Sequence, residues 1–210
     1  VTADSVIIAT GASARYLGLP DEEKYNGIGV SACATCDGFF YRGKTVAVVG
    51  GGDTACEEAL YLSTLAKKVF LIVRKAALRA SKVMQQRVLQ KENITVLFNC
   101  NTVGLFGDEF LEGAKLIENK GTEMEQVFDI AIDGFFLAIG HTPNTEVFKP
   151  YIKLDDAGFI VTENGTTQTS VEGIFAAGDV ADPRYRQAIS AAGSGCRAAI
   201  DAERFLLENS

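Results

Sequence analysis

The chain has 210 residues, of which 47% are hydrophobic and 22% charged, and its net charge is −7. This composition predicts a globular protein with a sizeable core and excludes a disordered chain, which would be less hydrophobic and more charged. The acidic balance and the lack of clustered Lys and Arg argue against nucleic acid or an anionic membrane as the main partner. No apolar run reaches the roughly 18 residues of a membrane-spanning helix, and residues 1–5 do not resemble a signal peptide, so we expect a cytoplasmic protein.

The first apolar run, Ser5–Ala9, has the composition of a buried parallel strand and begins almost at once, in a chain that starts without Met. A natural N-terminus rarely begins so abruptly, so we expect the sequence to be part of a longer protein. The five cysteines are an odd number and cannot all pair. This favours a reducing compartment, in which a disulfide would be redox-active rather than structural.

Strands and helices are expected to alternate from about residue 44. Lys44–Val49 is a β-branched run that ends at the glycines of residues 50–52, and Asp53–Lys68 then follows a helical period. Acidic residues near the start of this helix and basic residues at its end match its dipole. A second strand, Val69–Val73, completes a βαβ unit.

The central unit is expected to continue to about residue 140. Its further predicted elements are a helix capped by Ser81 and reaching about Asn93, a strand at Ile94–Phe98, a hairpin of Leu111–Glu118 with Gln126–Ile130, and a strand at Phe135–Ile139.

The pattern changes after Pro143. Short strands are expected around Gly158, and a long amphipathic helix from about Gln187 to Leu207. Two buried-type strands, Val6–Ala9 and Ile174–Ala177, lie outside the central unit, and we expect them to share one sheet.

We therefore predict an α/β fold with two domains. A Rossmann-like βαβ domain, a parallel sheet plus a hairpin, would occupy residues 15–141. It would be inserted into a partial second domain made of residues 1–14 and 142–210, with residues 1–14 including a hinge.

The strongest motif is Gly50-x-Gly52-x-x-Ala55, which directly follows a strand and opens a helix. Small residues here allow a tight turn and bring a pyrophosphate close to the backbone, while the helix N-terminus supplies N–H groups. The motif predicts nucleotide binding. The alternative is a merely tight turn between strand and helix.

The residues after the second strand indicate which nucleotide would bind. An NAD site usually has Asp or Glu about 20 residues beyond the glycines, where it binds the ribose 2′-hydroxyl. Here Arg74 and Lys75 follow Val73, and Arg79 lies one helical turn later. These cations suit a 2′-phosphate, so we expect NADPH rather than NADH. The alternative is an ordinary solvated basic turn.

A third motif is a pair of cysteines three residues apart, Cys33 and Cys36, followed by Asp37. Such a pair can form a reversible disulfide, and the carboxylate could supply or remove a proton. Zinc binding is one alternative, but it needs about four ligands, and the only histidine, His141, is far away in sequence. An inert pair of buried thiols is another. We therefore predict redox chemistry and no metal site.

The remaining cysteines, Cys56, Cys100 and Cys196, are expected to be small buried hydrophobic residues without a chemical role. His141 is expected to be a solvated loop residue at the junction of the two domains.

Taken together, the three motifs resemble the low-molecular-weight thioredoxin reductases, which are two-domain flavoproteins. The resemblance covers essentially the whole chain. It is carried by residues 8–12, 31–38, 50–55, 138–144, 177–180 and 186–188.

The resemblance implies an NADPH domain inserted into an FAD domain, with two connecting strands that act as a swivel. NADPH would reduce the flavin, the flavin would reduce the Cys33–Cys36 disulfide, and the dithiol would reduce thioredoxin. In this scheme Cys33 attacks the thioredoxin disulfide, Cys36 faces the flavin and Asp37 is the acid/base. The intact protein is expected to be a homodimer.

The resemblance also implies a set of cofactor-binding residues. Those expected on the 2′-phosphate of NADPH are Arg74, Lys75 and Arg79. Those expected on FAD are Asp179, Arg186, Gln187 and Ala188. The others expected at a cofactor are Thr10, Gly11, Gly50, Gly52, Asp53, Thr54, Ala55, Ile139, Gly140 and Gly178.

The chain departs from the family pattern in two places. Family members commonly have His-Arg-Arg where this chain has Val73, Arg74 and Lys75, and Lys keeps the charge but loses the planar fork of Arg. Family members also begin with a GxGxxG unit for the FAD pyrophosphate, so we expect about 100 residues to be missing here. The chain alone should then hold the NADPH site and the cysteine pair, bind FAD poorly or not at all, and be inactive.

Two alternative functions remain. The flavoprotein component of alkyl hydroperoxide reductase shares the fold and a Cys-x-x-Cys, but it prefers NADH and usually has an extra N-terminal module. For the chain by itself, a nucleotide-binding module without turnover is the other alternative. The basic turn at Arg74 and the motif sequence Cys-Ala-Thr-Cys favour thioredoxin reductase.

Overall fold

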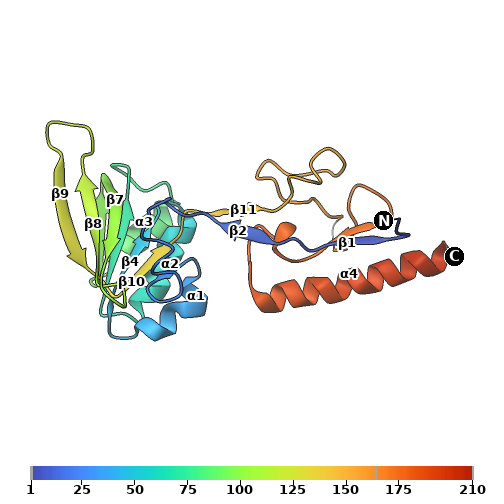
Figure 1. The fold of residues 1–210 in the computed structure, drawn as a ribbon, viewed down its shortest axis with the longest axis horizontal. Helices are drawn as coiled ribbons and strands as arrows, with labels where there is room; N and C mark the ends of the chain where they lie inside the picture. The colour runs from blue at the N-terminus through green and yellow to red at the C-terminus, as the bar shows by residue number, and fades with distance from the viewer. Residues whose placement is uncertain (1, 164, 210) are drawn as a thin grey trace. The chain divides into compact units, whose positions relative to one another are not determined.

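The computed structural model describes residues 2–163 and 165–209. The chain forms two compact units, one of Arg15–Gly140 and one of Val1–Ala14 with His141–Ser210. The first unit is therefore a continuous segment inserted into the second (Figure 1). In the part of the chain that the structure describes, no helix combines the length and the apolar character needed to cross a membrane.

The inserted unit is built on a parallel sheet in the order β3–β10–β4–β5–β6. Its strands are β3 (Val30–Ser31), β4 (Thr45–Val49), β5 (Lys68–Val73), β6 (Ile94–Phe98) and β10 (Gly134–Leu137). The near-continuous apolar runs of β4, β5 and β10 are explained by burial of the sheet on both faces.

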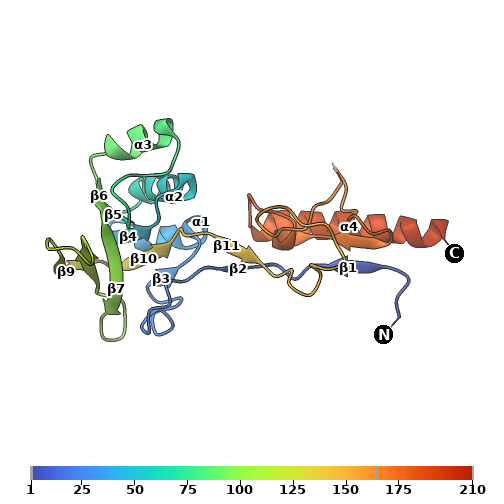
Figure 2. The same ribbon diagram turned by 90° about the horizontal axis from the view of Figure 1, so that it is seen from above.

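Alternate residues of the central strands enter two different cores. Val46 and Val48 of β4 face the helices together with Leu71 of β5, whereas Ala47 and Val49 belong to the core on the opposite face. This is the period of two that a strand imposes on its side chains. The sheet is consequently the middle layer of three, with helices on one side and an antiparallel sheet on the other (Figures 1 and 2).

The helical layer consists mainly of α2 (Asp53–Ser63) and α3 (Lys82–Leu89), with the short α1 (Ala34–Asp37) and the 3₁₀-helix η1 (Gly38–Tyr41) nearby. The small apolar face predicted for α2 is buried against the sheet at Ala55, Ala59 and Leu62.

Helix α2 ends five residues before the predicted Lys68. The N–H of Ala66 still donates to the carbonyl of Leu62 at 2.7 Å, but the N–H of Lys67 donates to the carbonyl of Lys44 at 2.8 Å. The backbone has thus already turned toward β4, and Lys68 begins β5. A hydrogen bond from a distant segment therefore decides where the helix stops, which a local period does not reveal.

The antiparallel sheet has the order β7–β8–β9, with β7 at Cys100–Phe106, β8 at Gly113–Glu118 and β9 at Gln126–Ala131. The hairpin of β8 and β9 confirms the prediction. Strand β7 was not predicted, because its residues lack a clean alternation and it starts directly after Asn99, whose φ of 55° turns the chain sharply after β6. A β-bulge interrupts β7 between Thr102 and Gly104.

In the other unit, β1 (Val6–Ile8) pairs in parallel with β12 (Ile174–Ala176), which confirms that these two distant segments share a sheet. β2 (Ala12–Ala14) pairs antiparallel with β11 (His141–Pro143). The 3₁₀-helix η2 (Gly178–Val180) precedes the long helix α4 (Ala188–Glu208).

Two expectations for this unit were wrong. His141 is not in a loop, because it begins β11 opposite Ala14 and is half-buried. The segment around Gly158 forms a single bridge between Leu154 and Ile160 rather than strands, since the Asp155 side chain accepts from the N–H of Phe159 and holds a turn. The overall α/β fold, with a parallel sheet plus a hairpin, is confirmed.

The core contact of α2 gives a direct test of this packing. Leu62 is 0% exposed between α2 and the sheet, so Leu62→Ala should lower the free energy of unfolding by about 2–5 kcal/mol. Leu89, at the end of α3, is 58% exposed, and Leu89→Ala should change that free energy by less than about 0.5 kcal/mol. Urea denaturation of both variants measures the difference, and equal losses would contradict the packing described here.

Candidate functional site

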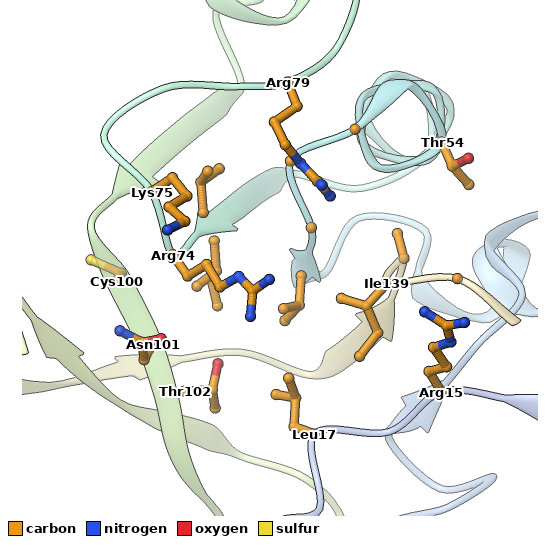
Figure 3. A pocket seen from close by; sticks show the side chains of 18 of the residues that line it. Arg15, Leu17, Thr54, Arg74, Lys75, Arg79, Cys100, Asn101, Thr102 and Ile139 are labelled. Carbon is orange, nitrogen blue, oxygen red and sulfur yellow. The ribbon is translucent and has the colours of Figure 1, made fainter.

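A cleft of about 600 Å³ lies inside the unit of Arg15–Gly140 (Figure 3). Its walls come from the segments that follow β4, β5 and β10, and from the start of β7. The three strands are parallel, so their carboxyl ends meet at one edge of the sheet. Ligands of open α/β sheets bind at such an edge.

The glycine turn after β4 is as tight as its sequence suggests. A Cβ on Gly50 would lie 2.5 Å from the carbonyl oxygen of Ala138 and 2.7 Å from the Cβ of Ala55. By contrast, a Cβ on Gly52 would meet no described heavy atom within 4 Å, so this side of the turn is open. Gly52 is the N-cap of α2 and has no side chain to cap its first N–H groups. The turn therefore leaves a cradle that fits a pyrophosphate.

Three predicted cations, Arg74, Lys75 and Arg79, all line the cleft. Figure 3 shows the Arg74 side chain reaching into its middle from the end of β5, with Lys75 and Arg79 at its rim. The loop that carries Arg79 is tied to the glycine turn, because the N–H groups of Arg79 and Ala80 both donate to the carbonyl of Gly51, at 2.6 and 3.2 Å.

Two residues predicted at the cofactor, Asp53 and Ala55, are not among those that line the cleft. The carboxylate of Asp53 accepts from the N–H of Ser81 at 2.9 Å, and this hydrogen bond holds the pKa of Asp53 below its usual value. Ala55 is fully buried under Gly50. Thr54, Ile139 and Gly140 line the cleft together with the glycines and cations.

Several lining residues were missed by the motif analysis. They are Arg15, Leu17, Val49, Gly51, Ile72, Val73, Ala77, Cys100, Asn101, Thr102 and Ala138. Those on β7 could not have been found from a βαβ motif, because β7 comes from the antiparallel layer. Arg15 and Leu17 precede the motif altogether, and no local pattern marks them.

The cysteine pair forms a disulfide, Cys33–Cys36, whose Cα atoms are 5.3 Å apart. Cys33 is the N-cap of α1, and the N–H of Cys36 points at the Cys33 sulfur over 3.2 Å. Cys36 is exposed and Cys33 is half-buried, so the bond is accessible from solvent. An accessible disulfide in a ring this small suits reversible oxidation.

Asp37 is held beside this pair by Ser31, the last residue of β3. The Ser31 hydroxyl donates to the Asp37 carboxylate at 2.6 Å and accepts from the N–H of Cys33 at 3.0 Å. One buried serine thus connects the carboxylate to the backbone of the disulfide. Asp37 also raises the pKa of Tyr41, after the larger effect of burial of that ring.

The other cysteines differ from one another. Cys56 and Cys100 are buried as expected, and burial raises the pKa of Cys56 to about 11 and that of Cys100 above its usual value. Cys196 is exposed, so the expectation that it is buried was wrong. The buried face of α4 runs through Ala198 and Ala202, and Cys196 is not on that face.

The residues predicted at FAD lie in the other unit. Gly178 has a φ of 75° and its N–H donates to the Ser194 hydroxyl at 2.8 Å, which ties the start of η2 to α4. The Oδ1 atom of Asp179 is buried and has no hydrogen-bond partner among the described residues. A buried acceptor without a donor fits a ligand that brings a donor of its own.

The other residues of this unit that were predicted at FAD or at an unspecified cofactor form the entrance to α4 and the turn after β1. Gln187 is the N-cap of α4 and shares a capping box with Ser190, and Ala188 is the first residue of the helix. Arg186 has a φ of 47° and its guanidinium donates to the carbonyl of Pro183. Near β2, the Thr10 hydroxyl donates to the carbonyl of Asn144 at 2.7 Å, and Gly11 accepts from the N–H of Asn144.

The different settings of the thiols predict a stepwise titration. Ellman's reagent at pH 8 should modify Cys196 rapidly in the native protein and Cys56 and Cys100 only after unfolding, because burial keeps those two thiols protonated and covered. Unfolded protein should show three thiols before reduction and five after it. Cys196→Ser should remove the rapid phase, and a rapid phase that persists in this variant would contradict the assignment.

Comparison with known proteins agrees with the motifs. The family model described as pyridine nucleotide-disulphide oxidoreductase matches residues 1–195. A thioredoxin reductase of Coxiella burnetii is 52% identical and is matched over 97% of this chain and 65% of its own length. A Pseudomonas fluorescens protein named glucosaminate ammonia-lyase is 54% identical over 98% of this chain and 65% of its own. The solved thioredoxin reductase from Giardia duodenalis superposes with a TM-score of 0.89 at 42% identity, over 98% of this chain and 66% of that one.

The chain thus spans about 65% of the length of the curated relatives that it matches. The resemblance to thioredoxin reductases that the motifs indicated is confirmed by these relatives. With the family model matching nearly all of its residues, the chain belongs to the pyridine nucleotide-disulphide oxidoreductase family.

Proposed function

We propose that this chain provides the NADPH site and the redox-active disulfide of a thioredoxin-disulfide reductase. The observation that carries the proposal is the Cys33–Cys36 disulfide with Asp37 fixed beside it, in the same unit as a nucleotide-sized cleft. A reductase needs both parts, because electrons that enter from a dinucleotide must leave through a thiol pair.

The cleft would bind NADPH by two kinds of contact. The N–H groups at the start of α2 would bind the pyrophosphate, since Gly52 leaves them accessible. Arg74 and Lys75 would bind the 2′-phosphate at the end of β5, where the sequence offers no carboxylate for a ribose hydroxyl. Because only Arg74 offers a planar fork to the phosphate, it would contribute more than Lys75 to the preference for NADPH over NADH.

FAD, when bound, would carry two electrons from NADPH to the disulfide. The residues that would hold it are Thr10, Gly11, Gly178, Asp179, Arg186, Gln187 and Ala188, and the buried Oδ1 of Asp179 supports this assignment. The whole protein's use of FAD, like its pairing into a homodimer, belongs to this proposal.

The disulfide chemistry would follow from the geometry around Cys33. After reduction, the Cys33 thiolate would attack one sulfur of the thioredoxin disulfide and form a mixed disulfide, and Cys36 would then attack Cys33 to release thioredoxin as a dithiol. The N–H of Cys36 supports negative charge on the Cys33 sulfur. Asp37, held by Ser31, would transfer the proton that the leaving thiolate requires.

The Pseudomonas fluorescens relative raises a second function, the release of ammonia from glucosaminate. A lyase step transfers no net electrons to a thiol pair, so it would give the Cys33–Cys36 disulfide no role. We therefore favour the reductase, and incubation of the protein with glucosaminate should release no ammonia.

The coenzyme assignment predicts a selective loss of affinity. Arg74→Ala should weaken NADPH binding about 10-fold and leave NADH binding nearly unchanged, because only NADPH has the phosphate. Arg87→Ala is the matched control, since Arg87 is an exposed cation in the last turn of α3 outside the cleft. Fluorescence titration measures both ligands. Equal affinities for NADPH and NADH in the unsubstituted chain would contradict the assignment of Arg74 and Lys75 to the 2′-phosphate.

The disulfide assignment predicts a complete loss of turnover. The test uses a full-length polypeptide that contains this chain and is as long as the thioredoxin reductases. In it, Cys33→Ser should lower the rate of NADPH-dependent thioredoxin reduction to background while NADPH still binds. Cys196→Ser, at an exposed thiol outside the pair, should retain full activity. If thioredoxin is still reduced by the Cys33 variant, the pair is not the route by which electrons leave.

A further inference from the structure

Thr102 is a polar residue in an unusual position on the cleft wall. It is 9% exposed, it lines the cleft, and its Oγ1 atom has no hydrogen-bond partner among the residues that the structure describes. Figure 3 shows its hydroxyl pointing into the cleft, toward the side on which Arg74 lies. The next residue back along β7, Asn101, also lines the cleft.

The backbone of β7 is distorted at this point. Thr102 pairs with Leu116 and Gly104 pairs with Lys115, so Val103 is an extra residue that forms a bulge in the strand. A β-bulge bends a strand and redirects the side chains beside it, and bulges are common next to binding sites. Here the bulge directly follows Thr102.

Stability does not explain a threonine at this position. A buried hydroxyl without a partner has lost its hydrogen bonds to water and gained none, whereas Val would fill the same space without that loss. Among the residues that the structure describes, the other buried hydroxyls are paired. Thr167, for example, is 1% exposed and donates to the Asp201 carboxylate at 2.7 Å. Because Thr102 lines the cleft, a ligand bound there is the candidate partner for its hydroxyl.

The position of Thr102 identifies the part of the ligand concerned. In the proposed function, the glycine turn holds the pyrophosphate and the end of β5 holds the 2′-phosphate, which leaves the base of the adenosine half to be bound. The other polar side chains of the wall are Arg15, Thr54, Asn101 and Thr102. Of these, Asn101 and Thr102 lie on β7, on the same side of the cleft as Arg74 (Figure 3). A hydroxyl both donates and accepts, as the donor and acceptor groups of an adenine edge require.

We infer that the hydroxyl of Thr102 hydrogen-bonds the adenine base of the dinucleotide. This inference rests on the proposed function, because it assumes that NADPH occupies the cleft. It adds a specificity-determining residue on the antiparallel layer, outside the βαβ motif.

The test compares Thr102→Val and Thr102→Ser with the unsubstituted chain. Thr102→Val should weaken the binding of NADPH and of adenosine 2′,5′-bisphosphate by the same factor, about 3- to 10-fold, and Thr102→Ser should stay within about 2-fold. Nicotinamide mononucleotide, which has no adenine, should bind the Val variant as it binds the unsubstituted chain. Titration calorimetry measures all three ligands.

A thermal melt without ligand separates binding from structure. Thr102→Val should melt at the same temperature as the unsubstituted chain or higher, because it removes an unpaired hydroxyl. Thr167→Val is the matched control and should melt lower without changing affinity, since that hydroxyl is paired.

Unchanged affinity of Thr102→Val for adenosine 2′,5′-bisphosphate would overturn the inference, and so would a lower melting temperature with unchanged affinity. If the unsubstituted chain binds neither NADPH nor the bisphosphate, the proposed function itself fails.

Discussion

The close approach of Gly50 to its neighbours is the constraint on which the cleft depends. Strand β4, the first turn of α2 and the end of β10 meet at this residue, with no room for even a methyl group between Gly50, Ala55 and the carbonyl of Ala138. Because the chain is this tight here, the N-terminus of α2 points over the sheet edge, and Ile139 and Gly140 lie at the same edge. The loop of Arg79 then closes against Gly51 and is braced by Asp53. A larger residue at Gly50 would separate three elements at once.

The redox pair and the cleft share the same sheet. Cys33 follows β3, β3 pairs with β10, and β10 pairs with β4, and all three strands run in one direction. The disulfide and the glycine turn therefore follow the carboxyl ends of two strands, β3 and β4, that lie on either side of β10. Ser31 links the sheet to the redox pair. It lies at the end of β3 and hydrogen-bonds both the Cys33 backbone and the Asp37 carboxylate.

Sequence patterns predicted the parts of this structure that depend on local order. The βαβ unit, the hairpin, the pairing of β1 with β12 and the cations after β5 follow from runs, turns and spacing. The patterns failed where a distant segment decides the outcome. Helix α2 stops early because Lys67 bonds to Lys44, His141 joins a strand because Ala14 is its partner, and β7 brings Asn101 and Thr102 to the cleft from another layer. Cys196 was misjudged because small neighbours in a helix do not reveal which face is covered.

The ends of the inserted unit meet in space. The N–H of Arg15, its first residue, donates to the carbonyl of Gly140, its last, at 3.0 Å. A segment whose ends are hydrogen-bonded to each other can be inserted into one loop of a host protein without distorting the backbone of the host or of the segment. The same geometry suits circular permutation, in which the old ends are joined by a short linker and new ones are opened in an exposed loop. Residues 15–140 are therefore suited to be transferred as one unit into another host protein.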